Sequence, residues 1–225
     1  MDNIKKKGGH HMSAHNSLKK HIYSKVENNK NEKLNKLLDT AYDLFTNKGI
    51  KHTSIQEIVD HAGVAKGTFY LYFKDKYELQ DYLLAITSYR LFEKALKACS
   101  TTQFDRLDSK IIFIINFIID ELINRTTLIH FIKKNLSLGL YSEKIPILID
   151  DEQLGLKELF IQDVKKKGLN MPHPETTLFM IIELTGSTVF TSLMNKEPLP
   201  INEYKPILYN TIKRMINEDG DVCGC

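Results

Sequence analysis

Tryptophan is absent from the 225-residue sequence, and only three cysteines, Cys99, Cys223 and Cys225, are present. Three cysteines are too few for a disulfide framework. Cys223 and Cys225 lie close together in the polar tail EDGDVCGC. The alternatives for this pair are a reduced, disordered tail, a redox switch or a thiolate metal site. Because a metal site needs further ligands and none is near in the sequence, we assign no metal and no cofactor.

Long apolar runs are also missing. The longest, IIFIINFII at residues 111–119, contains Asn116 and is far shorter than the roughly 20 residues that a membrane span needs. The N-terminus carries lysines and histidines instead of the apolar segment of a signal peptide. These absences predict a cytoplasmic protein with no membrane partner.

Enzyme motifs are absent as well. The sequence has no Gly-rich phosphate loop, no nucleophile elbow and no His, Cys and Asp residues at metal-ligand spacing. Its composition, 42% hydrophobic and 26% charged, is ordinary for a globular protein. We therefore predict no catalytic residues and expect a binding protein.

Strand-like alternation is missing too, whereas apolar residues recur at spacings of three and four. The sequence therefore predicts an all-α fold. Glycine and proline divide it into helices over about 17–49, 53–62, 65–72, 75–99, 104–124, 126–138, 147–167, 174–194 and 203–217. Thr53, with Gln56 three residues later, is the expected N-cap of the second helix, and Asp75 that of the fourth.

The charge is unevenly distributed. Residues 1–36 contain nine lysines and three acidic residues, residues 37–76 contain five of each sign, and residues 77–225 contain seventeen basic and twenty acidic residues. A basic arm on a slightly acidic body favours a polyanionic partner near the N-terminus, although such an arm can also serve only solubility.

Two short helices joined at Gly63 form a helix-turn-helix pattern. Phe69 and Phe73, four residues apart, should face inward. Lys66, Gly67, Tyr70 and Leu71 then face outward, with Thr68 and Tyr72 on the flanks. Lysine charge, hydroxyl groups and an apolar side chain are groups that contact phosphates and base edges in a major groove.

Residues 37–79, LLDTAYDLFTNKGIKHTSIQEIVDHAGVAKGTFYLYFKDKYEL, closely resemble the N-terminal domain of the TetR family of transcriptional repressors. The matching features are A-x-x-L-F-x-x-x-G, T-S-I-Q-E-I, A-G-V-A-K-G-T-F-Y-x-Y-F and K-x-K-x-x-L. The resemblance covers about residues 31–90. Beyond it, the chain agrees with the family only in length and helical character.

The resemblance implies a homodimer that binds a double-stranded DNA operator and is released by a small-molecule effector. Control by a protein partner or a corepressor is the alternative. Carried over by motif position, the predicted DNA contacts are Thr53, Ser54, Ala65, Lys66, Gly67, Thr68, Tyr70, Leu71, Tyr72 and Lys76. The expected organisation is a basic, partly disordered arm (1–29), a DNA-binding domain (30–90, motif about 53–72), an effector-binding and dimerisation domain (91–217) and a flexible tail (218–225).

Polar residues set among apolar ones are the best sequence clues to an effector site. The predicted ligand-binding residues are Phe113, Asn116, Phe117, His130, Asn135, Glu183 and Ser187, with Thr185 and Tyr141 as weaker choices. The last two helices are expected to dimerise as a four-helix interface. Its predicted residues are Met180, Gly186, Phe190, Ile207, Leu208, Ile212 and Met215.

Overall fold

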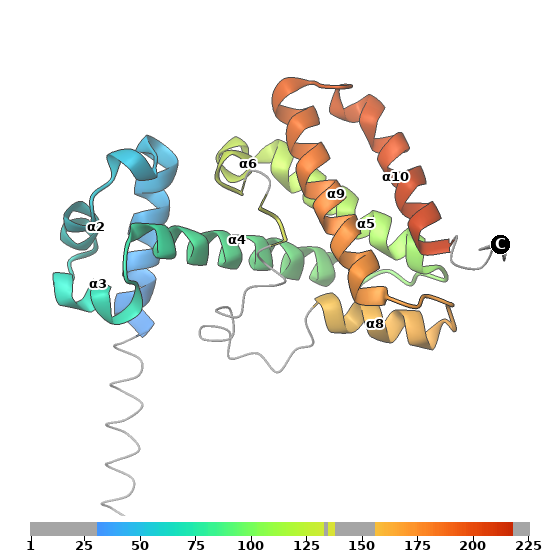
Figure 1. Ribbon diagram of the computed structural model, residues 1–225, viewed down its shortest axis with the longest axis horizontal. Coiled ribbons are helices and arrows are strands. Elements are labelled where there is room, and N and C mark those ends of the chain that lie inside the picture. The colour runs from blue at the N-terminus through green and yellow to red at the C-terminus, as the bar shows by residue number, and fades with distance from the viewer. Residues whose placement is uncertain (1–30, 133–134, 138–155, 218–225) are drawn as a thin grey trace, which may run out of the picture. The chain divides into compact units, whose positions relative to one another are not determined.

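The computed structural model describes residues 31–132, 135–137 and 156–217 (Figure 1). Over these residues the secondary structure is helical and contains no strand, so the all-α prediction is confirmed. The chain divides into two compact units, Met1–Leu79 and Gln80–Cys225. The predicted arm and tail, including Cys223 and Cys225, and also Tyr141, lie outside the described residues.

Unit 1 contains a first helix over residues 31–48, the short 3-10 helix η1 (Ile50–His52), α2 (Ile55–Ala62), α3 (Lys66–Tyr72) and the beginning of α4 (Lys76–Cys99). The first helix buries its apolar stripe, which includes Leu34, Leu37, Leu38, Ala41 and Phe45. It ends before Gly49, whose φ of 81° favours glycine because a side chain would strain the backbone there.

The N-cap of α2 is Ser54, so the prediction of Thr53 was wrong by one residue. The Ser54 hydroxyl accepts a hydrogen bond from the Glu57 amide at 3.1 Å. Thr53 is instead 1% exposed, and its hydroxyl donates to the Gly49 carbonyl at 3.0 Å. Because the Thr53 hydroxyl is buried and bonded to Gly49, it does not cap α2, and the hydroxyl of the following residue, Ser54, does so. At α4, by contrast, the Asp75 carboxylate accepts from the amides of Tyr77 and Glu78, as predicted for an N-cap.

The turn between α2 and α3 depends on Gly63. Its φ of 65° and ψ of 36° place it in the left-handed region. The Gly63 amide donates to the Asp60 carbonyl, and the Val64 amide donates to the Val59 carbonyl at 3.0 Å. This pair of bonds is the Schellman ending of a helix, and it redirects the chain from α2 into α3.

Unit 2 contains the rest of α4 and the helices α5 (Leu107–Asn124), α6 (Thr126–Ile132), α8 (Leu156–Lys166), α9 (Pro174–Asn195) and α10 (Ile201–Asn217). Helix α5 packs against α6, α9 and α10, and α9 packs between α8 and α10 (Figure 1). Three boundaries differ from prediction. Helix α5 begins at Leu107 and not near residue 104. Residues 135–137 form a turn instead of extending α6, and α10 begins at Ile201, where the Pro200 carbonyl accepts from the Glu203 and Tyr204 amides.

Helix α5 buries one broad face, and most of its other residues are half-buried, so it is less enclosed than its composition predicts. Ile111, Ile115, Ile118 and Ile119 are each at most 5% exposed. Among the described helices, α9 is long and apolar enough to cross a membrane, a property that the search for uninterrupted apolar runs missed. Its buried residues pack with α5, α8 and α10 in the core of unit 2, so that core packing accounts for its composition.

A buried carboxylate ties the beginning of α5 to the end of α10. The Asp108 side chain, 2% exposed, accepts hydrogen bonds from the Arg106 guanidinium at 2.7 and 3.1 Å. It also accepts from the Ser109 amide at 2.7 Å and the Asn217 side-chain amide at 2.9 Å. The Arg106 hydrogen bonds, and then those from Asn217 and Ser109, hold the pKa of Asp108 well below its ordinary value of 3.8.

Because the pKa of Asp108 is lowered in the folded state, its contribution to stability is complete above the ordinary carboxyl pKa and is lost as the pH falls below about 4. We expect Asp108→Asn to lower the free energy of unfolding by about 1–3 kcal/mol at pH 7. The difference from the native protein should narrow below about pH 4. Urea denaturation at fixed protein concentration measures both effects. The exposed Asp105→Asn is the control, and equal losses in the two variants would contradict the role of Asp108.

Candidate functional site

Helix α3 presents two different faces. Phe69 is fully buried and Phe73 is 4% exposed, with their ring centroids 5.9 Å apart, so their predicted inward orientation is confirmed. On the opposite side Tyr70 is 52% exposed and Leu71 is 78% exposed. The remaining predicted contacts follow the same division: Ala65, Lys66 and Gly67 are exposed, whereas Thr68 and Tyr72 are half-buried.

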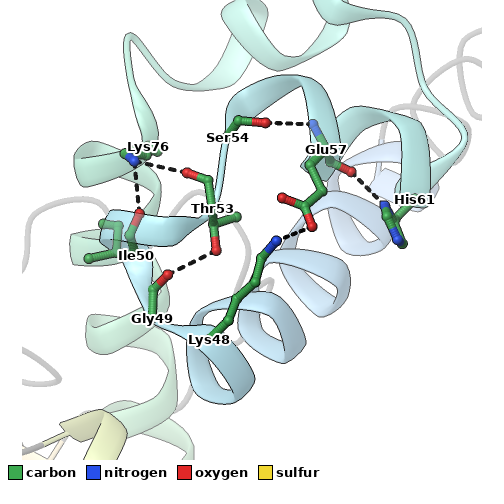
Figure 2. A network of polar contacts seen from close by, with 8 residues as sticks. All are labelled: Lys48, Gly49, Ile50, Thr53, Ser54, Glu57, His61 and Lys76. Atoms are coloured by element: carbon green, nitrogen blue, oxygen red, sulfur yellow. Dashed lines mark hydrogen bonds and ion pairs between the residues drawn. The ribbon is translucent and has the colours of Figure 1, made fainter.

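The outward face of α3 is chemically suited to a nucleic acid. The Tyr70 ring lies edge-on to Phe69, with centroids 5.4 Å apart, so the buried ring supports the exposed one. Lys66 is exposed, and no side-chain partner is found for its ammonium group among the described residues. By contrast, Lys48 forms an ion pair with Glu57 and thereby lowers the pKa of that carboxyl (Figure 2). Lys66 is therefore available to a phosphate or a base edge.

Two predicted phosphate contacts are engaged inside the protein instead. The buried Thr53 hydroxyl is not available on the surface. The Lys76 ammonium group donates to the carbonyl oxygens of Ile50 and Thr53, each at 2.8 Å (Figure 2). Ser54 is exposed, but its hydroxyl accepts from the Glu57 amide as the N-cap. Sequence position alone had assigned these residues to DNA without showing where their polar atoms point.

The family model described as "Bacterial regulatory proteins, tetR family" matches residues 37–83, which include α2, α3 and the beginning of α4. The chain is 25% identical to the HTH-type transcriptional regulator YvdT of Bacillus subtilis over 198 residues, 82% of this chain and 95% of that protein. The chain belongs to the TetR family. It is a transcriptional regulator with a DNA-binding domain.

Two further similarities agree with the TetR assignment. The HTH-type transcriptional regulator YerO of Bacillus subtilis is 48% identical over 46 residues, which are 20% of this chain and only 16% of YerO. The crystal structure of a TetR-family transcriptional regulator from Syntrophomonas wolfei has a TM-score of 0.54 at 21% identity, covering 87% of this chain and 98% of that one. At this identity the structural likeness concerns the fold.

Asn116, which was predicted to bind an effector, is hydrogen-bonded within the protein. Its side-chain oxygen accepts from the Tyr209 hydroxyl at 2.8 Å and from the Lys205 ammonium at 3.1 Å. Its side-chain nitrogen donates to Asp120 at 2.9 Å, and Lys205 also donates to Asp120 at 2.8 Å. The Asn116 amide is therefore already used in a polar cluster that joins α5 to α10.

The other predicted ligand residues, Thr185 excepted, do not line either of the two cavities described below. His130 and Asn135 are exposed. Phe113 and Phe117 are half-buried at the edge of the core, and the Phe113 ring lies 5.4 Å from that of Phe104. Glu183 and Ser187 are half-buried on α9. Core positions recur every three to four residues on a helix, with surface positions between them. The sequence pattern did not show which of these polar residues face the core and which face the surface.

A small cavity does lie in unit 2. Its volume of about 10 Å³ is enough for one water molecule. The lining residues come from α5, α6, the turn after α6, and α9: Ile118, Ile119, Leu122, Ile129, Ile132, Leu136, Thr185, Gly186, Val189 and Phe190. Thr185 is the one hydroxyl in this lining, and sequence analysis had ranked it below Asn116.

Thr185 differs from other hydroxyl residues of the same helix. It is 2% exposed, and its hydroxyl has no hydrogen-bond partner among the described residues. The hydroxyls of Thr177, Thr188 and Thr191 each donate to the carbonyl four residues earlier. A buried hydroxyl without a partner is costly, and it marks the point where a polar atom of another molecule would be accommodated.

An open cleft of about 520 Å³ lies between the end of α4, the beginning of α5 and α8. Its charged groups are largely used within the protein, because Lys110 forms an ion pair with Asp163 and Lys167 donates to the carbonyls of Phe104 and Asp105. Burial raises the pKa of the Cys99 thiol at the edge of the cleft, which disfavours a reactive thiolate.

The predicted dimer residues divide into exposed and buried groups. Met180 is 47% exposed and Ile207 is 51% exposed, as an interface residue should be in a single chain. Leu208 and Ile212 are at most 2% exposed in the core, so their prediction as interface residues was wrong. Gly186 is buried beside the cavity, and Phe190 and Met215 are half-buried against the core. Phe179, 43% exposed, was missed.

We expect Lys66→Ala and Tyr70→Ala each to weaken operator binding by about 1–3 kcal/mol, because both side chains are exposed on α3 while Phe69 and Phe73 hold the helix. Fluorescence anisotropy with a labelled operator measures the loss, and circular dichroism checks folding. Lys165→Ala, which removes an exposed lysine from α8, is the control and should bind normally. Normal binding by both α3 variants would contradict the assignment.

Proposed function

We propose that the protein is a transcriptional repressor that binds a palindromic operator as a homodimer and is released by a small, neutral, largely apolar effector. The observation that carries the proposal is the Thr185 hydroxyl, which lies in the small apolar cavity of unit 2 and has no hydrogen-bond partner among the described residues. It supports a site for an effector in the unit that does not carry α3.

The operator is proposed to be palindromic because a two-fold symmetric dimer presents the same helix twice. Two copies of α3 must lie about 34–36 Å apart to enter successive major grooves on one side of the duplex. The proposed contacts are the exposed Ala65, Lys66, Gly67, Tyr70 and Leu71 with the flanking Thr68 and Tyr72. Ser54 remains a proposed contact at the beginning of α2.

The proposed dimer face lies on α9 and α10, which pack side by side in unit 2 (Figure 1). Phe179, Met180 and Ile207 are the large exposed apolar side chains on these two helices. Large apolar side chains that remain exposed on neighbouring helices are typical of a surface that another chain covers. Two such helices from each protomer would form a four-helix interface.

We expect Ile207→Glu to convert the dimer to monomer and to weaken operator binding by about 2 kcal/mol or more, because an unpaired carboxylate would be buried at the interface. Analytical ultracentrifugation measures the association. Ile123→Glu is the matched control, since Ile123 is also exposed, at 41%, but belongs to α5 and not to the two helices of the proposed face. An Ile207→Glu variant that remains dimeric would place the interface elsewhere.

The lining of the cavity indicates the chemistry of the effector. Nine of its ten residues offer no side-chain hydrogen-bonding group, and Thr185 offers one hydroxyl. A charged ligand would lose its hydration without gaining a partner of opposite charge. The residues therefore favour an uncharged, mainly apolar molecule with one hydroxyl or carbonyl group. The cavity must expand to admit it, which requires α5, α6 or α9 to move.

Expansion of the cavity would be transmitted through the core that these helices share with α4. Leu91, Phe92 and Ala95 of α4 belong to the same buried cluster as Ile118 and Ile119. An effector that favours the expanded state can lower operator affinity only as far as its affinities for the two states differ. Because the coupling is reciprocal, bound DNA must lower the affinity for the effector by the same factor. We propose a tilt of α4 between the two states.

We expect Thr185→Val to remove the effector response while leaving operator affinity without effector unchanged. Because the lost hydroxyl has no partner, the free energy of unfolding should be unchanged or raised by up to about 1 kcal/mol. Thr177→Val is the control, since Thr177 is also buried but its hydroxyl is hydrogen-bonded, and this change should cost about 1 kcal/mol.

The effector is sought by thermal shift with straight-chain alcohols and ketones, followed by operator titration. A compound that stabilises the native protein but not Thr185→Val, and that weakens operator binding, supports the proposal. A compound that tightens operator binding would instead indicate a corepressor. A full response in Thr185→Val would show that the cavity is not the effector site.

A further inference from the structure

Lys76, the first residue of α4, is positioned differently from an ordinary surface lysine. Its side chain is half-buried, and its ammonium group reaches back to the turn between the first helix and α2 (Figure 2). There it donates to the carbonyl oxygens of Ile50 and Thr53, both at 2.8 Å. These residues are 26 and 23 positions earlier in the chain, so the contact joins distant segments.

The two carbonyl groups flank the short helix η1. Ile50 begins η1, and its carbonyl also accepts from the Thr53 amide at 3.3 Å, whereas Thr53 follows the end of η1 and precedes the α2 N-cap, Ser54. A cation is favoured beside carbonyl groups at the end of a helix. The Thr53 hydroxyl donates to the Gly49 carbonyl in the same turn, at 3.0 Å. Lys76 and Thr53 together brace the turn that leads into α2.

Helix α4 does not need Lys76 for its own beginning. The Asp75 carboxylate accepts from the amides of Tyr77 and Glu78, at 2.9 and 2.8 Å. The Glu78 carboxylate accepts from the Lys74 amide at 2.7 Å. Neighbouring residues therefore already cap the first turn of α4. The Lys76 ammonium group instead serves a contact between segments.

We propose that Lys76 is a positioning residue for DNA binding and not a phosphate contact. Its ammonium group locks the first turn of α4 to the turn before α2. Because α2 and α3 pack together through the Gly63 turn, this lock fixes how α3 is presented to DNA. The part that Lys76 would play in effector release rests on the proposed function, since α4 is the continuous helix that leads from unit 1 into unit 2.

The salt dependence of operator binding separates the two roles of a lysine. A lysine that neutralises a phosphate contributes about 0.9 to the slope of log affinity against log salt concentration. A lysine that holds carbonyl groups within the protein contributes to folding and affinity but not to that slope. Lys66→Met and Lys76→Met are therefore a matched pair, because each removes one ammonium group and keeps an apolar stem.

We expect Lys76→Met to weaken operator binding about tenfold, the scale of one hydrogen bond from a charged donor, with the same salt slope as the native protein. It should also lower the melting temperature and speed hydrogen exchange at the amides of Thr53 and Glu57. Lys66→Met should reduce the slope by about 0.9 and leave the melting temperature unchanged. Operator titrations between 50 and 300 mM salt, on the full chain, provide the slopes.

Lys76→Gln is a second variant, which keeps one amide donor and should recover part of the stability and the affinity. It also provides the test if Lys76→Met does not fold. A slope reduced by about 0.9 in either Lys76 variant would overturn the assignment, whatever its stability. Normal affinity, normal melting temperature and normal exchange would overturn it equally. These measurements need no effector, so a failure of the proposed effector control would be distinguishable from a failure here.

Discussion

The burial of Phe69 and Phe73 is the interaction on which the DNA-binding unit depends. Helix α3 has seven residues, too few for a helix to be stable alone in water. Removing each phenylalanine ring from water contributes roughly 1.5–3 kcal/mol, and together the rings hold α3 against the rest of unit 1. Because these two side chains anchor the helix, the exposed side chains of Lys66, Tyr70 and Leu71 on the opposite face are not needed to hold it in place. They are available to contact DNA.

Two polar clusters of unit 2 have their hydrogen bonds satisfied within the protein. Asn116, Asp120, Lys205 and Tyr209 satisfy one another between α5 and α10, and the buried Asp108 is satisfied by Arg106, Ser109 and Asn217. Such clusters fix the register of neighbouring helices and have little capacity for another ligand. The Thr185 hydroxyl lies among aliphatic side chains and has no partner among the described residues, so it has hydrogen-bonding capacity that these two clusters lack.

Helix α4 gives the regulator a continuous structural element. Its first residue, Lys76, holds the turn before α2, and its later residues Leu91, Phe92 and Ala95 lie in the apolar core of unit 2. A helix transmits displacement because its backbone hydrogen bonds resist bending more than a loop does. Under the proposed release mechanism, the contact at Lys76 is one route by which a change of packing around Leu91 would reach the Gly49–Thr53 turn.

The sequence by itself determined the helical class, most helix boundaries and the two faces of α3. These properties depend on local spacing: Phe69 and Phe73 are four residues apart, and Gly49 and Gly63 occupy positions where positive φ is needed. Its motif also indicated the TetR family. Local pattern was sufficient wherever the deciding contacts lie within a few residues of each other.

Only the tertiary structure decided which polar atoms are already in use. Asn116 and Lys76 have the same residue types as available contacts, but Tyr209 and Ile50 provide their partners from distant parts of the chain. Leu208 and Ile212 likewise belong to the core because α10 turns that side toward α5 and α9. Thr185 stands out only because no partner approaches it. Whether a polar atom has a hydrogen-bond partner and whether a side chain is buried depend on how distant segments pack together. The periodicity of residues along one helix does not show that packing.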